Sequence, residues 1–236
     1  MTSLVSPNNP RIKQIRVLLA QRKAREEKGL FVVEGIHHVG EAIEAKAEVE
    51  YLCYAPDLLI SEYALHLIQE QEHNGTPCLA VDGDTFTSIA GKDNPQGVLA
   101  VAHQAHSKLS DLTPQSFPWG VACVAPQDPG NIGTILRTID AVGASGLLLL
   151  DDPTNSQYCA DPYHPSAVRA SMGAIFWYPL VHAQFSEFVA WSKEQHYSIY
   201  GTSAHARQDY REIGRFTQPL ILLMGSEREG LTPSQS

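Results

Sequence analysis

Apolar and polar positions alternate along the chain in a pattern that predicts an α/β protein. In several segments apolar residues recur every three or four positions, which is typical of helices with one buried face. Short apolar runs lie between these segments and predict strands. In the first half of the chain, helices are expected over 8–27, from the end of the first strand through Ala47, over 58–72 and over 84–90. Strands are expected over 30–33, 49–55, 76–81 and 97–103.

A second alternating series follows, with strands expected over 120–125, 146–150, 197–201 and 220–224 and helices over 132–142 and 185–196. The runs 147–150 and 220–224 are apolar without polar alternation. Such runs are typical of parallel strands that helices cover on both faces. Residues 106–118 are rich in Ser, Pro, Asp and Gln, with weak periodicity, which favours a linker. Two domains are therefore predicted, over 1–105 and 119–236.

Composition narrows the class of protein. The 236 residues are 43% hydrophobic and 18% charged, with a formal net charge of −9, which is ordinary for a soluble globular protein. The apolar runs are far shorter than a membrane span, and the first residues lack the apolar core of a secretory signal, so a cytoplasmic protein is expected. The four cysteines form no C-x-x-C pair, and no metal site is expected.

Basic residues are concentrated in one segment. Residues 11–28 hold seven basic and two acidic side chains, a local charge of +5 that leaves −14 on the rest of the chain. A polyanion would therefore have to bind a local patch. Taken alone, the segment is explained more simply as the solvated face of a helix whose apolar residues turn inward.

The first segment that is suited to chemistry is the loop Pro-Gln-Asp-Pro-Gly-Asn-Ile-Gly at 126–133, which follows a strand and opens a helix. Gly130 and Gly133 permit unusual backbone shapes, and Asn131 is a suitable helix cap. A polar ligand or anion can bind at such a helix start. The spacing matches neither a dinucleotide-binding loop nor a P-loop. The residues alone fit a capped turn as well as a binding loop.

The second segment follows the apolar run 220–224 and is bounded by Gly225 and Gly230. Open α/β sheets bind ligands at the carboxyl ends of their strands. Glu227 is suited to orient a hydroxyl or a guanidinium there, although an exposed carboxylate paired with Arg228 is the simpler explanation of this segment by itself.

A third segment, 161–174, reads as a turn that leads into a helix of small residues. Asp161 and His164 are possible metal ligands, but no third ligand accompanies them, so a turn is predicted in place of a metal site.

Together these segments resemble the SpoU branch of the SPOUT methyltransferases, which includes the TrmH-like RNA ribose 2′-O-methyltransferases. Asn131, Gly133 and Arg137 fall where the first motif of that family has Asn, Gly and Arg, and 225–231 resembles its second motif. The segments 169–174 and 94–97 also look like segments that recur in the family. The likeness extends over nearly the whole chain.

The resemblance implies a fold and an activity. The fold would be an N-terminal ribosomal-protein-like α/β substrate-binding domain joined to a C-terminal parallel-sheet domain with a trefoil knot, and the enzyme would be a homodimer. The activity would be methyl transfer from S-adenosylmethionine to a ribose 2′-hydroxyl of RNA, with large-subunit rRNA favoured over tRNA. The implied catalytic residues are Asn131, Arg137 and Glu227, the implied cofactor-binding residues are Thr202, Met224 and Gly225, and the implied RNA-binding residues are Arg11, Lys13, Arg16 and Lys28.

The sequence departs from the family at its end. The family's third motif, a Ser-Leu-Asn segment followed by an apolar helix, has no counterpart after 225–231. A C-terminally incomplete methyltransferase domain with an incomplete knot is therefore expected. A non-catalytic RNA-binding protein that has lost its cofactor site is the alternative. A nucleotide-binding oxidoreductase is disfavoured, because no dinucleotide-binding fingerprint follows a candidate first strand.

Overall fold

The computed structural model describes residues 4–91, 94–203, 206 and 208–235. The chain divides into two compact units, residues 1–104 with 162–176 and residues 105–161 with 177–236. The segment 162–176 therefore belongs to the first unit, although it lies in sequence within the range 119–236 that was assigned to the second domain. As a result, the chain passes from one unit to the other three times.

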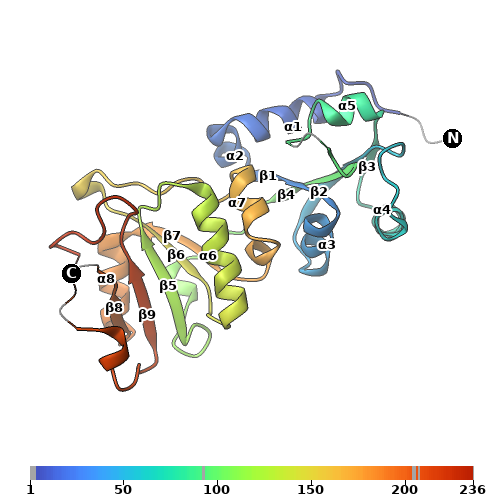
Figure 1. Cartoon of the computed structure of the whole chain (residues 1–236). Coiled ribbons are helices and arrows are strands. Elements are labelled where there is room, and N and C mark those ends of the chain that lie inside the picture. Colours follow the sequence, from blue (N-terminus) through green and yellow to red (C-terminus); the bar gives the residue numbers. More distant parts are fainter. Residues whose placement is uncertain (1–3, 92–93, 204–205, 207, 236) are drawn as a thin grey trace. The chain divides into compact units, whose positions relative to one another are not determined.

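The first unit is a mixed sheet with helices on both faces. Its strand order is β1-β4-β2-β3, with β4 antiparallel to both of its neighbours and β2 parallel to β3. The strands are β1 (Leu30–Glu34), β2 (Val49–Tyr54), β3 (Cys78–Ala80) and β4 (Val98–His103). One face carries α1 (Pro10–Ala20), α2 (Arg22–Lys28) and α5 (Gly83–Thr87), and the other carries α3 (Ile36–Glu44) and α4 (Glu62–His73) (Figure 1).

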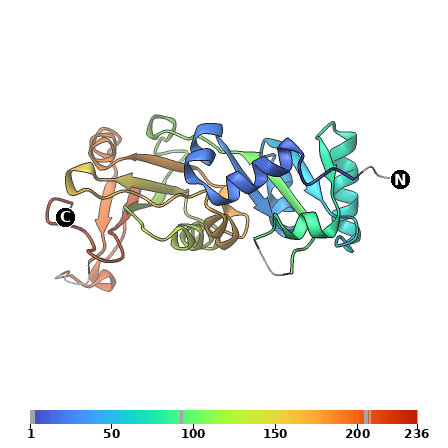
Figure 2. The ribbon, with the colours of Figure 1, turned by 90° about the horizontal axis from the view of Figure 1, so that it is seen from above.

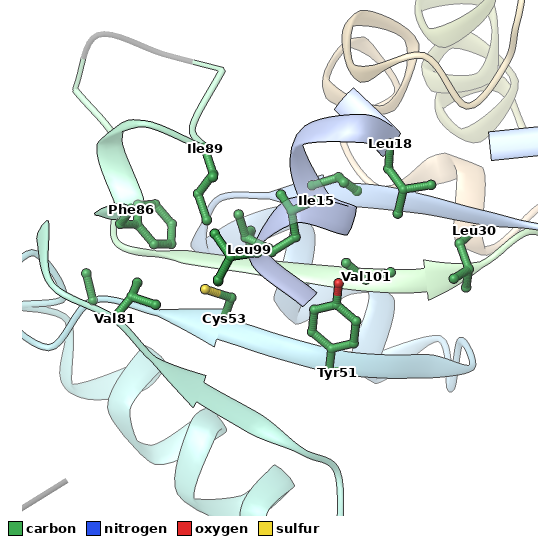
Figure 3. Close-up of a cluster of buried hydrophobic side chains, with 13 residues drawn as sticks. Ile15, Leu18, Leu30, Tyr51, Cys53, Val81, Phe86, Ile89, Leu99 and Val101 are labelled. Carbon is green, nitrogen blue, oxygen red and sulfur yellow. The ribbon is translucent and has the colours of Figure 1, made fainter. Parts of the chain in front are cut away.

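The core under α1 follows the helical periodicity of the sequence. Ile12, Ile15 and Leu18 recur at intervals of three residues and are completely buried. They pack on the side chains of alternate sheet residues, among them Leu30 and Tyr51 (Figure 3). This interlocking of a helix face with one face of a sheet fixes α1 on the first unit.

The opposite face of β1 is covered by the segment 162–176. The ring centroid of Phe31 lies 4.7 Å from that of Tyr163 and 6.0 Å from that of Phe176. The helix α7 (Pro165–Ala170) lies between these two partners in the sequence and contacts β1. Phe31 is only 1% exposed as a result. The first unit thus completes its core with residues that come late in the chain.

The single helix expected over 8–27 is two helices, α1 and α2, separated at Gln21. Gln21 has an extended backbone with φ −124° and ψ 115°. Arg25 is only 2% exposed, and its Nη1 donates hydrogen bonds to the carbonyl oxygens of Leu18 at 2.5 Å and Leu19 at 3.4 Å. The last carbonyls of a helix have no partner within the helix, and Arg25 supplies one. Arg25 is therefore internal and does not contribute to a basic surface.

The second unit is built on a parallel sheet, which confirms the fold class expected for the C-terminal domain. The strand order is β7-β6-β5-β9-β8, and all pairs are parallel. The strands are β5 (Trp119–Val124), β6 (Leu147–Asp151), β7 (Leu180–Gln184), β8 (Ser198–Gly201) and β9 (Leu220–Met224). The helices α6 (Pro129–Val142) and α8 (Phe185–Glu194) lie on opposite faces of the sheet (Figure 2).

Part of the segment 106–118, expected as a linker, packs into the core of the second unit. Leu112 and Phe117 are 6% and 0% exposed. The Phe117 ring lies so close to β5 that a Cβ on Gly120 would approach its Cε1 to 2.1 Å. Leu112 and Phe117 are five positions apart among mostly polar residues and give no sustained periodic signal, which is why the sequence did not predict this packing. Within the described ranges, no helix is long and apolar enough to cross a membrane.

We expect Phe31→Ala to destabilise the protein by about 3–5 kcal/mol, because the ring is buried between β1 and the segment 162–176. Ile60→Ala is the control, since Ile60 is 92% exposed and such surface changes shift stability by about 0.5 kcal/mol or less. Denaturant unfolding monitored by circular dichroism measures both. Equal effects of the two substitutions would contradict the packing of 162–176 on β1.

Candidate active site at the carboxyl ends of the parallel strands

The loops that follow β5 and β9 meet at one edge of the sheet. The two strands are paired in parallel, with Cys123 opposite Met224, so both loops leave the sheet at the same end. Glu227 Oε1 accepts a hydrogen bond from Asn131 Nδ2 at 3.1 Å, and its Oε2 accepts one from the backbone N–H of Gln127 at 3.1 Å. The structure thus brings together Asn131 and Glu227, which are 96 residues apart.

The start of α6 is capped by Asp128, and not by Asn131 as the sequence analysis suggested. Asp128 Oδ1 accepts a hydrogen bond from the backbone N–H of Gly130 at 2.7 Å, and Pro129 occupies the first helical position. Pro is favoured at that position because its missing N–H would have no helical partner there. With Asp128 as the cap, Asn131 lies inside the first turn and its side chain is directed to Glu227.

Gln127 is a site residue that the sequence analysis did not single out. Its Nε2 donates hydrogen bonds to the carbonyl oxygens of Ala125 at 2.7 Å and Tyr158 at 2.8 Å. Ala125 has a φ of 46°, which is uncommon for a residue with a side chain. Gln127 therefore holds an unfavourable turn in place and ties it to the segment around Tyr158. Its position in the loop between Pro126 and Asp128 was the only signal in the sequence.

The environment of Glu227 stabilises its ionised form. Burial raises the pKa of this carboxyl, but the side-chain hydrogen bond from Asn131 and backbone hydrogen bonds, including that from Gln127, lower it more. The net result is a pKa below the usual range of a glutamate. A carboxylate only accepts hydrogen bonds, so Asn131 must direct its NH₂ group toward Glu227. The Oδ1 of Asn131 is left to accept a hydrogen bond from another group.

Gly225 is required by the shape of the second loop. A Cβ at this position would lie 2.0 Å from the carbonyl carbon of Gly230 and 2.3 Å from the nitrogen of Leu231. The loop closes through a hydrogen bond of 3.0 Å from the N–H of Gly230 to the carbonyl oxygen of Ser226. Only glycine permits this close return of the backbone.

The residues implied as cofactor-binding lie at the ends of two neighbouring strands. Thr202 follows β8, and both its N–H and its Oγ1 donate to the carbonyl oxygen of Leu223, at 2.9 Å and 3.3 Å. Met224 ends β9, and Gly225 follows it. Because β8 and β9 are paired in parallel, all three residues lie at the carboxyl edge of the sheet.

A small polar pocket of about 290 Å³ lies beside the two loops. Two of its lining residues are hydrogen-bonded to each other, since Gln157 Nε2 donates to Glu229 Oε2 at 2.9 Å. The pocket is lined by Ala125, Gln127, Ser156, Gln157, Tyr158, Ser226, Arg228 and Glu229.

Arg137 is not joined to the pair formed by Asn131 and Glu227. It lies on α6 and is exposed. In the part of the chain that the structure describes, its side chain makes no hydrogen bond or ion pair. Its guanidinium is therefore available to a group outside the chain.

The four residues implied as RNA-binding differ in how firmly the first unit holds them. Arg11 places its guanidinium carbon 5.1 Å from the centre of the Tyr51 ring, and Arg16 donates to Pro7 O at 3.2 Å and Ser88 Oγ at 3.0 Å. Lys13 and Lys28 are exposed. Over the described ranges, neither lysine side chain has an intramolecular partner.

Two family descriptions match the chain. Residues 118–235 match the SpoU rRNA Methylase family, and residues 9–100 match the MRM3-like substrate binding domain. The chain belongs to the SpoU rRNA methylase family. The first match contains the whole of the paired loops, and the second contains most of the sheet and helices of the first unit.

Individual relatives are similar over most of their lengths. The chain is 30% identical over 235 residues to the 23S rRNA (uridine(2479)-2′-O)-methyltransferase of Streptomyces viridochromogenes, covering 97% of this chain and 78% of the relative. It is 27% identical to the 23S rRNA (guanosine(2553)-2′-O)-methyltransferase RlmP of Bacillus subtilis, covering 98% of this chain and 85% of the relative. Among solved structures, the AdoMet-bound rRNA methyltransferase of Sinorhizobium meliloti matches with a TM-score of 0.84 and 34% identity, over 97% of this chain and 82% of that one.

We expect Asn131→Ala to raise the pKa of Glu227 toward that of an ordinary glutamate, because the hydrogen bond from Asn131 stabilises the ionised carboxyl. A lowered pKa contributes stability that is present at neutral pH and is lost as the pH falls through the folded-state value. Carboxyl-carbon NMR titration of Glu227 measures the shift. Asn74→Ala, in the other unit, is the control, and an unchanged Glu227 titration in Asn131→Ala would contradict the assigned contact.

Proposed function

We propose that this protein transfers a methyl group from S-adenosylmethionine to a ribose 2′-hydroxyl of 23S rRNA. The observation that carries the proposal is the contact between the two motif loops, in which Asn131 donates to an ionised Glu227 at the carboxyl edge of a parallel sheet. Membership of the SpoU rRNA methylase family supports methyl transfer to RNA. The names of the two relatives support 23S rRNA over tRNA and ribose over base.

The proposed cofactor fits the edge of the sheet where Thr202, Met224 and Gly225 lie. The ends of β8 and β9 are neighbours there, as in other open α/β sheets that bind ligands. Backbone groups of these three residues would hold the cofactor. When bound there, S-adenosylmethionine would supply an electrophilic methyl group, which would exchange its bond to sulfur for a bond to the ribose oxygen, and the hydroxyl proton would pass to solvent.

The paired loops would orient the ribose. Asn131 has its NH₂ group fixed by Glu227, so its Oδ1 is placed to accept a hydrogen bond from the 2′-hydroxyl. Gln127 holds the backbone of the first loop, which keeps Asn131 in position. Fixing the geometry of two reacting groups in this way removes much of the entropic barrier to reaction.

Arg137 would act as a fixed positive charge. A guanidinium stays protonated in proteins at neutral pH, so we assign it no role as a proton acceptor. Its planar fork is suited to bind a phosphate or the negative charge that develops on the ribose oxygen. The exposed position of Arg137 on α6 leaves it accessible to RNA.

We assign RNA binding to the N-terminal domain over 1–105 and methyl transfer to the domain over 119–236, to whose core the segment 106–118 contributes Leu112 and Phe117. Lys13 and Lys28 would bind phosphates, with Arg11 and Arg16 beside them. Phosphate contacts position RNA without specifying its sequence. The match of residues 9–100 to a substrate binding domain supports the assignment.

Three further proposals rest on the family resemblance. The enzyme acts as a homodimer, it works in the cytoplasm, and its C-terminal domain has the trefoil-knot type of fold.

The activity is tested by transfer of a labelled methyl group to a 23S rRNA fragment. We expect a single 2′-deoxy nucleotide at the target to abolish transfer. Arg137→Lys should lower the rate by about 100-fold or more, because lysine lacks the guanidinium fork and loss of one charge-stabilising donor typically costs 10²–10³ in rate. Arg211→Lys is the control, since Arg211 already pairs with Asp209 at 2.6 Å.

Two outcomes would contradict the proposal. Transfer that persists with the deoxy substrate would indicate methylation of a base. A near-normal rate in Arg137→Lys, with a pH profile like that of the parent, would remove the role of the planar guanidinium.

RNA binding is tested by replacing Lys13 and Lys28 together with alanine. If each lysine neutralises one phosphate, the slope of log K against log salt should become shallower by about 1.5–2. Lys46→Gln is the control, because Lys46 follows α3 on the opposite face of the first sheet. A slope equal to that of the control would place the RNA elsewhere on the protein.

A further inference from the structure

Three side chains with different functional groups lie close together in the second unit. None of them has a role in the proposed methyl transfer. They are Asp151, Cys159 and His182, and one ligand atom from each lies within 4.8 Å of the other two. We propose that this cluster is a binding site for a divalent cation of the zinc class.

The sheet brings two of the ligands together. Asp151 ends β6 and His182 lies within β7, and the two strands are paired in parallel with Leu149 opposite His182. Asp151 is two residues beyond Leu149, so it lies on the same face of the sheet as His182, diagonally across the pair. His182 Nε2 is 3.0 Å from Asp151 Oδ2.

The third ligand is anchored to the first. The backbone N–H of Cys159 donates to Asp151 Oδ1 at 2.7 Å. This bond fixes the carboxylate and leaves Oδ2 on the side of His182. Carboxylates that bind metals are commonly held by such a hydrogen bond to their second oxygen.

The donor set is suited to zinc. A thiolate, an imidazole and a carboxylate are the three side-chain groups that bind Zn²⁺, and three protein ligands with one water is a common arrangement. Hard cations such as Mg²⁺ prefer oxygen ligands and would bind weakly here. Cys159 is 2% exposed, whereas the side chains of Asp151 and His182 are 23% and 41% exposed, so a cation can enter from the side of the histidine.

Binding would change the state of the cysteine. Burial and the nearby Asp151 raise the pKa of Cys159, so the free thiol is protonated at neutral pH. A bound dication reverses this preference. The S–H bond breaks, its proton passes to the buffer, and the sulfur forms a bond to the metal.

The cation would also stiffen the first motif loop. The residues on either side of Cys159 are bonded to that loop, since Tyr158 O accepts from Gln127 Nε2 at 2.8 Å and the N–H of Ala160 donates to Pro126 O at 2.7 Å. Fixing Cys159 would therefore restrict the segment that Gln127 ties to the active site.

Cobalt(II) binding to the chelator-treated full chain tests the site. Co²⁺ replaces Zn²⁺ at thiolate sites and reports a sulfur ligand through a charge-transfer band in the near ultraviolet. We expect one equivalent of Co²⁺ to produce this band and one equivalent of Zn²⁺ to remove it. Hydrogen exchange of the Ala160 amide should be slower with Zn²⁺ than without it.

Variants identify the ligands. Cys159→Ser should abolish the thiolate band. His182→Gln should weaken Co²⁺ binding by more than about 100-fold, because loss of a residue that only hydrogen-bonds to a metal ligand typically weakens binding by about 10- to 100-fold. Cys78→Ser is the matched control, because Cys78 lies in the first unit. Since Cys159 is buried and its variant can fail to fold, the exposed His182 provides the independent test.

Three results would overturn the proposal. The parent protein could show no thiolate band at equimolar Co²⁺, the band could persist in Cys159→Ser, or His182→Gln could bind Co²⁺ as tightly as the parent. In each case the cluster would be a set of internal hydrogen bonds only.

Discussion

The parallel pairing of β5 with β9 is the constraint on which the active site depends. It places Cys123 opposite Met224, so two loops about a hundred residues apart leave the sheet side by side. The hydrogen bonds from Asn131 and Gln127 to Glu227 then join the loops directly. Because β5 and β9 are inner strands, each paired with a neighbour on both sides, the loops start from a rigid base, and the position of Glu227 relative to Asn131 follows from the register of the sheet.

The loops themselves are locally unfavourable and are held by specific contacts. A positive φ at a non-glycine residue such as Ala125 costs about 1–3 kcal/mol. The two side-chain hydrogen bonds of Gln127 offset this cost and at the same time join the loop to Tyr158. On the other loop, Gly225 removes the clash that a side chain would make with Gly230. Strain of this kind persists where the surrounding structure fixes the backbone, which is common at functional sites.

Local patterns in the sequence predicted much of the fold, but they predicted none of the contacts between segments that are far apart in the chain. The apolar runs 147–150 and 220–224 correctly indicated parallel strands, but only the first is buried on both faces, since alternate residues of β9 are partly exposed. The structure also places the motif residues Asn131 and Glu227 in contact. The strand β7 was missed, because His182 and Gln184 interrupt its apolar pattern.

The other differences depend on tertiary contacts that a local pattern does not encode. The break at Gln21 goes with the burial of Arg25, and the placement of 162–176 depends on Phe31, more than a hundred residues away. The cluster of Asp151, Cys159 and His182 was likewise invisible, since its members belong to separate segments without a ligand spacing.

The charge distribution of the first unit explains how an acidic protein can present a surface to RNA. Most of its basic side chains lie on α1 and α2, whereas α3 and α4, on the opposite face of the sheet (Figure 1), carry exposed acidic side chains such as those of Glu44 and Glu70. A helix is about 10 Å across, so two helical layers and the sheet between them separate the faces by more than the Debye length of about 8 Å at physiological salt. The two faces therefore act on a polyanion nearly independently. The net charge of −9 describes the whole chain, but an approaching phosphate experiences only the face that it meets.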